Sequence, residues 1–84
     1  MDVRSVRRRL NSIGICCNLS RDGKHGRACI LRPATDNGEA WMTWLVASVG
    51  TLPGVIATTT RVTPYLGKRI EVSTDFCMGH EDCL

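Results

Sequence analysis

The sequence predicts an α+β fold in which one small domain contains a helix–strand–strand unit twice. Residues 1–32 and 36–74 share the same order: a helical apolar period, a glycine stop, and two strand-like runs joined by a turn. An offset of forty residues superposes Val6 on Val46, Gly14 on Gly54, Ile15 on Val55 and Ile30 on Ile70. Identities between the units are near chance, so the repeat is one of pattern. Two such units predict a four-stranded antiparallel sheet with both helices packed on one face. An alternative is that each unit pairs with its counterpart in a second chain.

The first unit begins with a helix whose apolar residues lie on one side. These residues recur at helical spacing and are Val3, Val6, Leu10 and Ile13. Asp2 is placed to cap the first turn, and Gly14 can adopt the left-handed conformation that ends a helix. A strand, a glycine-rich turn and a return strand are then predicted at residues 15–19, 20–26 and 28–33.

The second unit is predicted to supply the central core helix. Asp36 and Glu39 have the spacing of a capping box, so the helix is expected over residues 38–49. Its apolar side includes Trp41, Trp44 and Leu45. A strand, a turn and a return strand follow at residues 55–62, 63–67 and 68–74. Residues 75–84 lie outside the repeat and are expected to form a tail.

Size and composition favour a small binding protein over an enzyme. The chain has 84 residues, of which 43% are apolar and 23% charged, typical of one globular domain with a limited core. No GxSxG, HExxH or paired-carboxylate motif is present. The charged N-terminal segment is unlike a signal peptide, and the apolar run at residues 40–49 is too short to span a bilayer. We therefore expect a cytoplasmic protein without a membrane partner.

Charge is distributed unevenly along the chain. Residues 1–32 contain eight Lys and Arg against two Asp, a net charge of +6, whereas residues 33–84 contain three basic and six acidic residues, a net charge of −3. The candidate partner- or phosphate-binding residues are Arg4, Arg7, Arg8, Arg9, Arg21, Lys24 and Arg27. If they share one side, they would bind phosphates with little sequence preference. A solvated helix face and an acidic protein surface are the alternatives.

The chain contains five cysteines, which could be free thiols, disulfide-bonded or metal-bound. Cys77, His80 and Cys83 have the chemistry of zinc ligands, and a fourth ligand could come from Cys16, Cys17, Cys29 or His25. A Cys77–Cys83 disulfide is an alternative, and so are unpaired thiols with Cys17 and Cys29 as small core residues. Pairing of a cysteine nucleophile with a base, Cys77 with His80 or Cys16 with His25, lacks an orienting third group. Zinc is thus the one cofactor considered, and no other is expected.

Three further segments bear on possible partners. The turn at residues 21–26 could cradle a phosphate, although it lacks the P-loop pattern, and a plain solvated turn is the alternative. Trp41 and Trp44 are expected in the core, and either would be a natural anchor for a partner if exposed. The uncharged run at residues 58–60 would favour pairing with another chain at a sheet edge, so a homodimer is possible.

These observations predict a non-enzymatic interaction protein that binds and blocks a larger protein or nucleoprotein complex. Small single-domain chains of this kind include inhibitors from phages and mobile elements, anti-CRISPR proteins among them, although no motif of such a family is present. The first alternative is a nucleic-acid-binding module that uses the arginines of the first helix and first hairpin. The second is a small zinc-supported domain.

Overall fold

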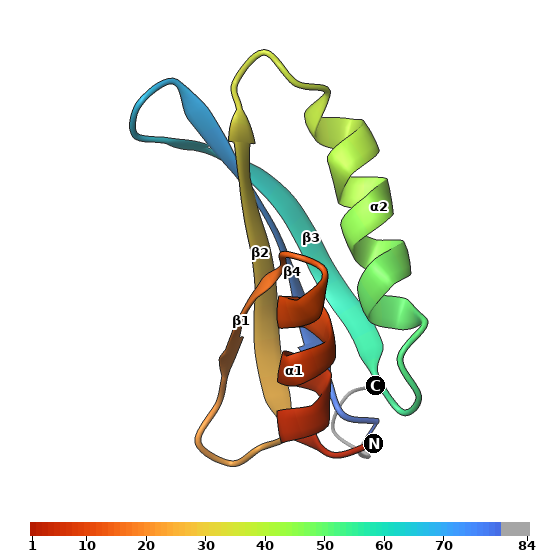
Figure 1. Cartoon of the computed structure of the whole chain (residues 1–84). Helices are drawn as coiled ribbons and strands as arrows, with labels where there is room; N and C mark the ends of the chain where they lie inside the picture. Colours follow the sequence, from red (N-terminus) through yellow and green to blue (C-terminus); the bar gives the residue numbers. More distant parts are fainter. Residues whose placement is uncertain (80–84) are drawn as a thin grey trace.

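The computed structural model describes residues 1–79 and contains two helices and one antiparallel sheet (Figure 1). In chain order the elements are α1 (Val3–Ser12), β1 (Cys16–Leu19), β2 (His25–Pro33), α2 (Gly38–Gly50), β3 (Ile56–Tyr65) and β4 (Arg69–Cys77). The four strands lie in the order β1-β2-β4-β3. The predicted α+β fold is confirmed. The first strand of each hairpin lies at an edge, and the two second strands meet in the centre.

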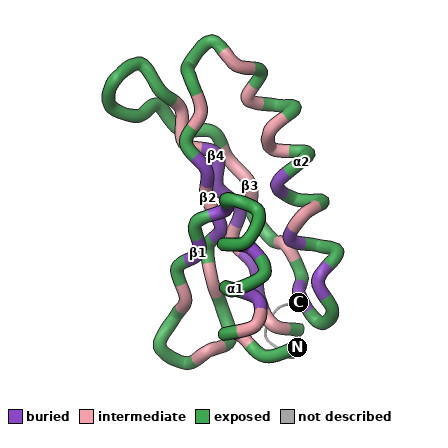
Figure 2. The backbone as a smooth tube through the Cα atoms, viewed as in Figure 1, coloured by how far each residue is buried: buried purple, intermediate pink, exposed green. Residues whose placement is uncertain are grey.

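Both helices cover the same face of the sheet, as predicted. Ala28 of β2 lies opposite Thr74 of β4, and Ile30 lies opposite Val72. These side chains point to the helical face, where they join one core cluster with Val6 and Leu10 of α1 and Leu45 and Val49 of α2. In Figure 2 the buried stretches gather along β4 and on the helix sides that face the sheet. The other face of the sheet, called the open face below, carries no helix within the described residues 1–79.

The two helices rest on different strands. α1 packs mainly on the edge strand β1, whereas α2 packs over β3 and β4 (Figure 1). Asp2 caps α1 by accepting a 2.8 Å hydrogen bond from the backbone N–H of Ser5, and Gly14 adopts φ +82° just after the helix. Both features are as predicted. Ile13, however, is 53% exposed, because the helix ends before it and Ile15 fills the core instead.

The N-cap of α2 differs from the prediction by one residue. Asn37, not Asp36, caps the helix, and its Oδ1 accepts from the backbone N–H of Ala40 at 3.1 Å. The Asp36 carboxylate instead accepts a 3.1 Å hydrogen bond from the indole N–H of Trp41 and lies 3.5 Å from Nε of Arg32. Asp36 therefore links α2 to β2, which a local capping pattern does not reveal.

The second hairpin is longer than predicted. β3 continues to Tyr65 and β4 to Cys77, so residues 75–77, which were expected in a tail, belong to the sheet. Phe76 is only 1% exposed and is one of the largest fully buried side chains. No described helix, within residues 1–79, combines the length and apolar character needed to cross a membrane.

Candidate polyanion-binding face

Helix α1 presents its arginines to solvent because its buried residues lie on the opposite side. Val6 and Leu10 are fully buried against the sheet, and all four arginines of the helix are exposed. Successive residues are about 100° apart around an α-helix. Arg4 and Arg8 therefore lie one turn apart on the outer side with Arg7 beside them, while Arg9 lies further round the helix.

These arginines have no ionic partner among the described residues. The ion pairs of arginines within residues 1–79 involve Arg27, Arg32 and Arg61 instead. Asp2 is the nearest acidic residue in the sequence, and its carboxylate already accepts from Ser5. This hydrogen bond from the Ser5 backbone lowers the pKa of Asp2. The positive charges of α1 are thus available to interact with solvent or with a binding partner.

The β1–β2 turn lies beside the first turn of α1 (Figure 1). A methyl group placed on Gly23 would lie 3.8 Å from Cγ1 of Val3, so the turn and the helix start are in contact range. Arg21 and Lys24 are exposed in this turn. We call the combined surface the basic face, and its residues are Arg4, Arg7, Arg8, Arg9, Arg21 and Lys24.

The backbone of the β1–β2 turn bonds to the turn itself. The N–H of Lys24 donates to Asp22 at 2.9 Å, and the N–H of His25 donates to the hydroxyl of Ser20 at 3.1 Å. The N–H of Gly23 donates to the carbonyl of Ser20 at 3.1 Å. Hydrogen bonds from Ser20 first, and from Lys24 second, lower the pKa of Asp22. A phosphate cradle needs free N–H groups for its ligand, and these three are occupied, so the turn offers a phosphate mainly the side-chain charges of Arg21 and Lys24.

Arg27 does not lie with the other basic residues. It projects from β2 onto the open face, where its Nε is 2.7 Å from Oδ1 of Asp75 on β4. Arg61 of β3 lies 3.4 Å from the other oxygen of the same carboxylate. Burial alone would raise the pKa of Asp75, but the hydrogen bond and charge of Arg27, with those of Arg61, lower it. Strand alternation could have found this separation, since Ala28 and Ile30 face the core and Arg27 must face away.

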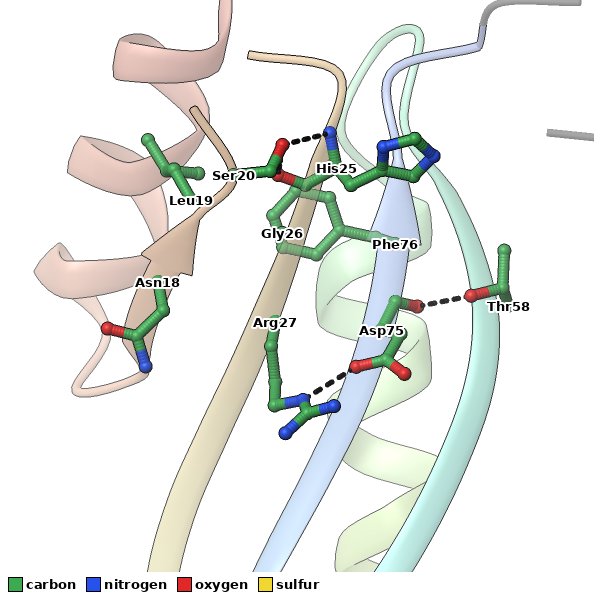
Figure 3. A pocket seen from close by; sticks show the side chains of 9 residues that line it. All are labelled: Asn18, Leu19, Ser20, His25, Gly26, Arg27, Thr58, Asp75 and Phe76. Atoms are coloured by element: carbon green, nitrogen blue, oxygen red, sulfur yellow. Dashed lines mark hydrogen bonds and ion pairs between the residues drawn. The ribbon is translucent and has the colours of Figure 1, made fainter. Parts of the chain in front are cut away.

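A hollow of about 520 Å³ with both polar and apolar lining lies at the end of the sheet near the β1–β2 turn (Figure 3). Its lining includes Asn18, Ser20, His25, Arg27, Thr58 and Asp75. The Ser20 hydroxyl donates to Asp22 and accepts from the backbone of His25, so its proton faces a carboxylate and not the imidazole. This geometry differs from a Ser-His-Asp triad, in which the imidazole accepts the serine proton. The Ser20 contacts stabilise the turn.

The structure separates most of the sulfur ligands considered above. Cys16 lies opposite Cys29 on the open face, and His25 is four residues further along β2. Cys17 points into the core, as predicted, whereas Cys29 is half-buried on the open face and not in the core. Cys77 is disulfide-bonded, and His80 and Cys83 lie outside the described residues. Within residues 1–79 no group of three His, Cys, Asp or Glu is placed to hold a metal ion. The zinc site stays a prediction, and it would require reduction of Cys77, because zinc binds thiolates.

No family model, curated protein or solved structure matches this chain.

A second surface, which the sequence pattern did not predict, lies between the helices. Trp44 is 39% exposed, and the rings of Trp41 and Trp44 meet edge to face with centroids 5.3 Å apart. The Arg32 guanidinium stacks 4.2 Å from the centre of the Trp41 ring. Together with Ile13, Gly14, Ile30 and Ala40, these residues line a mainly apolar hollow of about 510 Å³. We call it the interhelical groove. The pair of tryptophans was the feature of the sequence that could have indicated this groove. Their exposure, however, depends on the distance between α1 and α2, which the sequence pattern does not reveal.

Proposed function

We propose that the protein is a non-enzymatic binding module that docks its basic face on the phosphate backbone of a nucleic acid or nucleoprotein. The observation that carries this proposal is the contrast between two sets of arginines. Arg27, Arg32 and Arg61 are held in ion pairs, whereas the arginines of α1 have none within the described part of the chain. An exposed, uncompensated cluster of arginines repels itself, and binding to a polyanion relieves that repulsion.

Arginine suits phosphate because its planar guanidinium donates two parallel hydrogen bonds to two oxygens. The basic face has no aromatic side chain on which a base could stack, so its contacts would be to the backbone. Backbone contact gives affinity with little sequence preference and a steep dependence on salt, because each neutralised phosphate releases counterions. The expected slope of log affinity against log salt is roughly −0.9 per phosphate contacted on duplex DNA.

The test is fluorescence anisotropy with labelled duplex DNA and single-stranded RNA over a salt series. The variant Arg4→Gln/Arg8→Gln removes two outward charges and keeps good helix formers. We expect it to weaken binding about tenfold, at ~0.7 kcal/mol for each exposed contact, and to reduce the salt slope by about 2.

The matched control is Lys68→Asn/Arg69→Gln, which removes the same charge at the β3–β4 turn, at the opposite end of the molecule from the β1–β2 turn (Figure 1). We expect it to leave the salt slope nearly unchanged. Equal effects of the two double variants would show that only net charge matters. Salt-insensitive binding, or none, would contradict the proposal.

The interhelical groove favours a second candidate, a protein that binds and blocks another protein. A half-exposed tryptophan beside an apolar hollow is a typical anchor of protein interfaces. In affinity capture from the cell that makes the protein, we expect a partner that survives nuclease treatment and is lost with Trp44→Ala. Loss of every partner after nuclease treatment would rule out this candidate in favour of the first.

A further inference from the structure

Cys16 and Cys29 form a pair of thiols across the first hairpin. They are directly opposite each other in the β1–β2 ladder, and both are free. Their neighbours Cys17 and Ala28, which are opposite each other one step along, are buried in the core. Because side chains alternate along a strand, Cys16 and Cys29 both project from the open face. Cys16 is exposed and Cys29 is half-buried.

The ladder determines how close the two cysteines are. Ser20 and His25 form a hydrogen-bonded pair, because the N–H of Ser20 donates to the carbonyl of His25 at 2.9 Å. Hydrogen-bonded pairs recur at every second residue, so Cys16 and Cys29, four steps along, are also such a pair. The Cα atoms in such a pair are about 5.5 Å apart. Disulfides usually span Cα distances of roughly 4.4–6.8 Å, so the Cα separation of this pair lies within the range of a disulfide.

The neighbouring thiol also affects the acidity of Cys29. Burial first, and the neighbouring Cys16 second, raise the pKa of Cys29 to about 11. Cys17 is a poor competitor because its side chain is in the core, where burial raises the pKa of its thiol. Cys77 is already disulfide-bonded. Cys16 is therefore the exposed thiol that meets a reagent, and Cys29 is the thiol placed beside it.

We propose that Cys16 and Cys29 are a reversible dithiol site that low-molecular-weight disulfides oxidise to a cross-strand disulfide. The Cys16 thiolate attacks one sulfur of the reagent RSSR, and the S–S bond breaks to release one thiolate RS⁻. Cys29 then loses its proton to solvent, attacks the Cys16 sulfur of the mixed disulfide, and expels the second RS⁻. Two protein thiols are oxidised and one RSSR is reduced to two RSH, so atoms and electrons balance.

The same geometry makes the bond easy to reduce. Hydrogen-bonded pairs hold their Cβ atoms at the long end of the cross-strand range, about 5.5 Å, whereas relaxed disulfides prefer about 3.8 Å. The mismatch strains the bond, and strained, exposed disulfides are the labile ones. Oxidation would tie the short edge strand β1, on which α1 rests, to β2. This inference is independent of the proposed function, because no residue of the basic face takes part.

The test treats the native protein with oxidised glutathione and maps the products by mass spectrometry without reduction. Trypsin cleavage after Arg9, Arg21, Arg27 and Arg61 places Cys29 in peptide 28–61, because the Arg32–Pro33 bond resists trypsin, and both Cys16 and Cys17 in peptide 10–21. We expect these two peptides to become linked, with loss of two hydrogens from the intact mass. The link should persist in Cys17→Ala, be replaced by a single glutathione adduct on Cys16 in Cys29→Ser, and be absent in Cys16→Ser.

Three results would overturn the proposal. They are two glutathione adducts without a link in Cys17→Ala, a link that survives in Cys16→Ser through Cys17, and a link that resists excess reduced glutathione. The first two would assign the chemistry to separate or different thiols, and the third would show a structural bond and not a reversible one. Circular dichroism of each variant verifies that it folds.

Discussion

At the scale of single residues, one close contact in the sheet is between a glycine and a phenylalanine. Gly26 of β2 lies opposite Phe76 of β4 on the helical face. A Cβ at position 26 would overlap the Phe76 ring, at 2.9 Å from its Cε atoms and nearer still to Cζ. Phe76 is 1% exposed and belongs to the core cluster, so its ring would have to shift to admit a Cβ. The absence of a side chain at Gly26 is therefore a requirement of the core.

Gly26→Ala is expected to destabilise the protein by about 1–3 kcal/mol, the usual cost of overpacking a core. The measurement is the free energy of unfolding from urea titrations followed by circular dichroism. Gly50→Ala is the control, because a Cβ there meets nothing within 4 Å at the end of α2. It should leave stability unchanged or slightly raised. Similar effects of the two substitutions would mean that the Phe76 ring moves aside easily.

Single residues also show where local sequence patterns are not sufficient to predict the structure. Asp36 and Asn37 are both good N-cap residues, and the spacing to Glu39 favoured Asp36. The choice is decided by Trp41 and Arg32, which need an acceptor that only Asp36 can provide at that point. A cap depends on neighbouring residues in the chain, whereas this choice depends on a strand and a helix packing together.

At the scale of elements, one carboxylate joins three strands. Asp75 of β4 bonds to Arg27 of β2 on one side and to Arg61 of β3 on the other, and its backbone carbonyl accepts from Thr58 at 3.1 Å. The network lies on the open face, where no helix covers the sheet. Its polar contacts hold the central strand β4 to the edge strand β3 on the open face. On the helical face the strands are held by apolar contacts instead.

Asp75→Asn is expected to cost about 1 kcal/mol of stability near neutral pH, since the side chains remain partly exposed and solvent screens the pair. The pKa of Asp75 is lowered in the folded protein, so the unfolded chain binds the proton more readily. The stabilisation is therefore present above the unfolded pKa, near the ordinary value of 3.8, and is lost as pH falls through the folded pKa.

Urea unfolding of the wild type and of Asp75→Asn should thus differ at pH 7 and converge as the pH falls through the folded pKa of Asp75, which lies below 3.8. Glu39→Gln removes the same charge from the first turn of α2 and serves as the control. We expect it to cost only a few tenths of a kcal/mol, through the helix dipole. A constant difference between wild type and Asp75→Asn at every pH would show that the effect comes from shape and not from charge.

At the scale of the whole molecule, β3 is one of the two exposed edges of the sheet. The β2–β4 ladder continues through Ala34 and Met78, which donate to Lys68 and Lys24 at 2.9 Å, so even-numbered residues of β4 bond to β2. Odd-numbered residues of β4 then bond to β3, and Val62 and Pro64 turn their backbone groups outward. A bulge between Ala57 and Thr60, the charge of Arg61 and the missing N–H of Pro64 all oppose pairing with another chain.

Pro64→Val should restore an outward N–H and promote self-association through this edge. One hydrogen bond is worth about 1 kcal/mol, so the association constant is expected to rise about fivefold. Sedimentation velocity over a concentration series measures it. Thr63→Val is the matched control, because its backbone groups bond to β4 and the edge gains no donor. If the wild type already pairs through β3, Pro64→Val will cause no increase.

Much of the fold could be predicted from the spacing of apolar residues alone, and particular residues show why. The helical spacing of Val6 and Leu10 and the strand alternation around Ala28 and Ile30 each reflect one buried face, so a sequence can reveal them. Pairing between distant strands leaves no such local trace. Phe76 looked like part of a tail because its partner, Gly26, is half the chain away. The exposure of the α1 arginines also follows from the helical period, but the separation of Arg27 from the basic face depends on strand register.

The order of the strands has a consequence for how the chain reaches this structure. Each hairpin and each helix can form from neighbours in sequence, but the central seam joins residues 25 and 77 at one end and 33 and 69 at the other. Contacts so distant in sequence require closure of a long loop before they stabilise anything, and such closure slows folding. Pairing of β2 with β4 is thus the folding step that we expect to commit the chain to this structure. Until it forms, each unit exposes a central strand with one unsatisfied side.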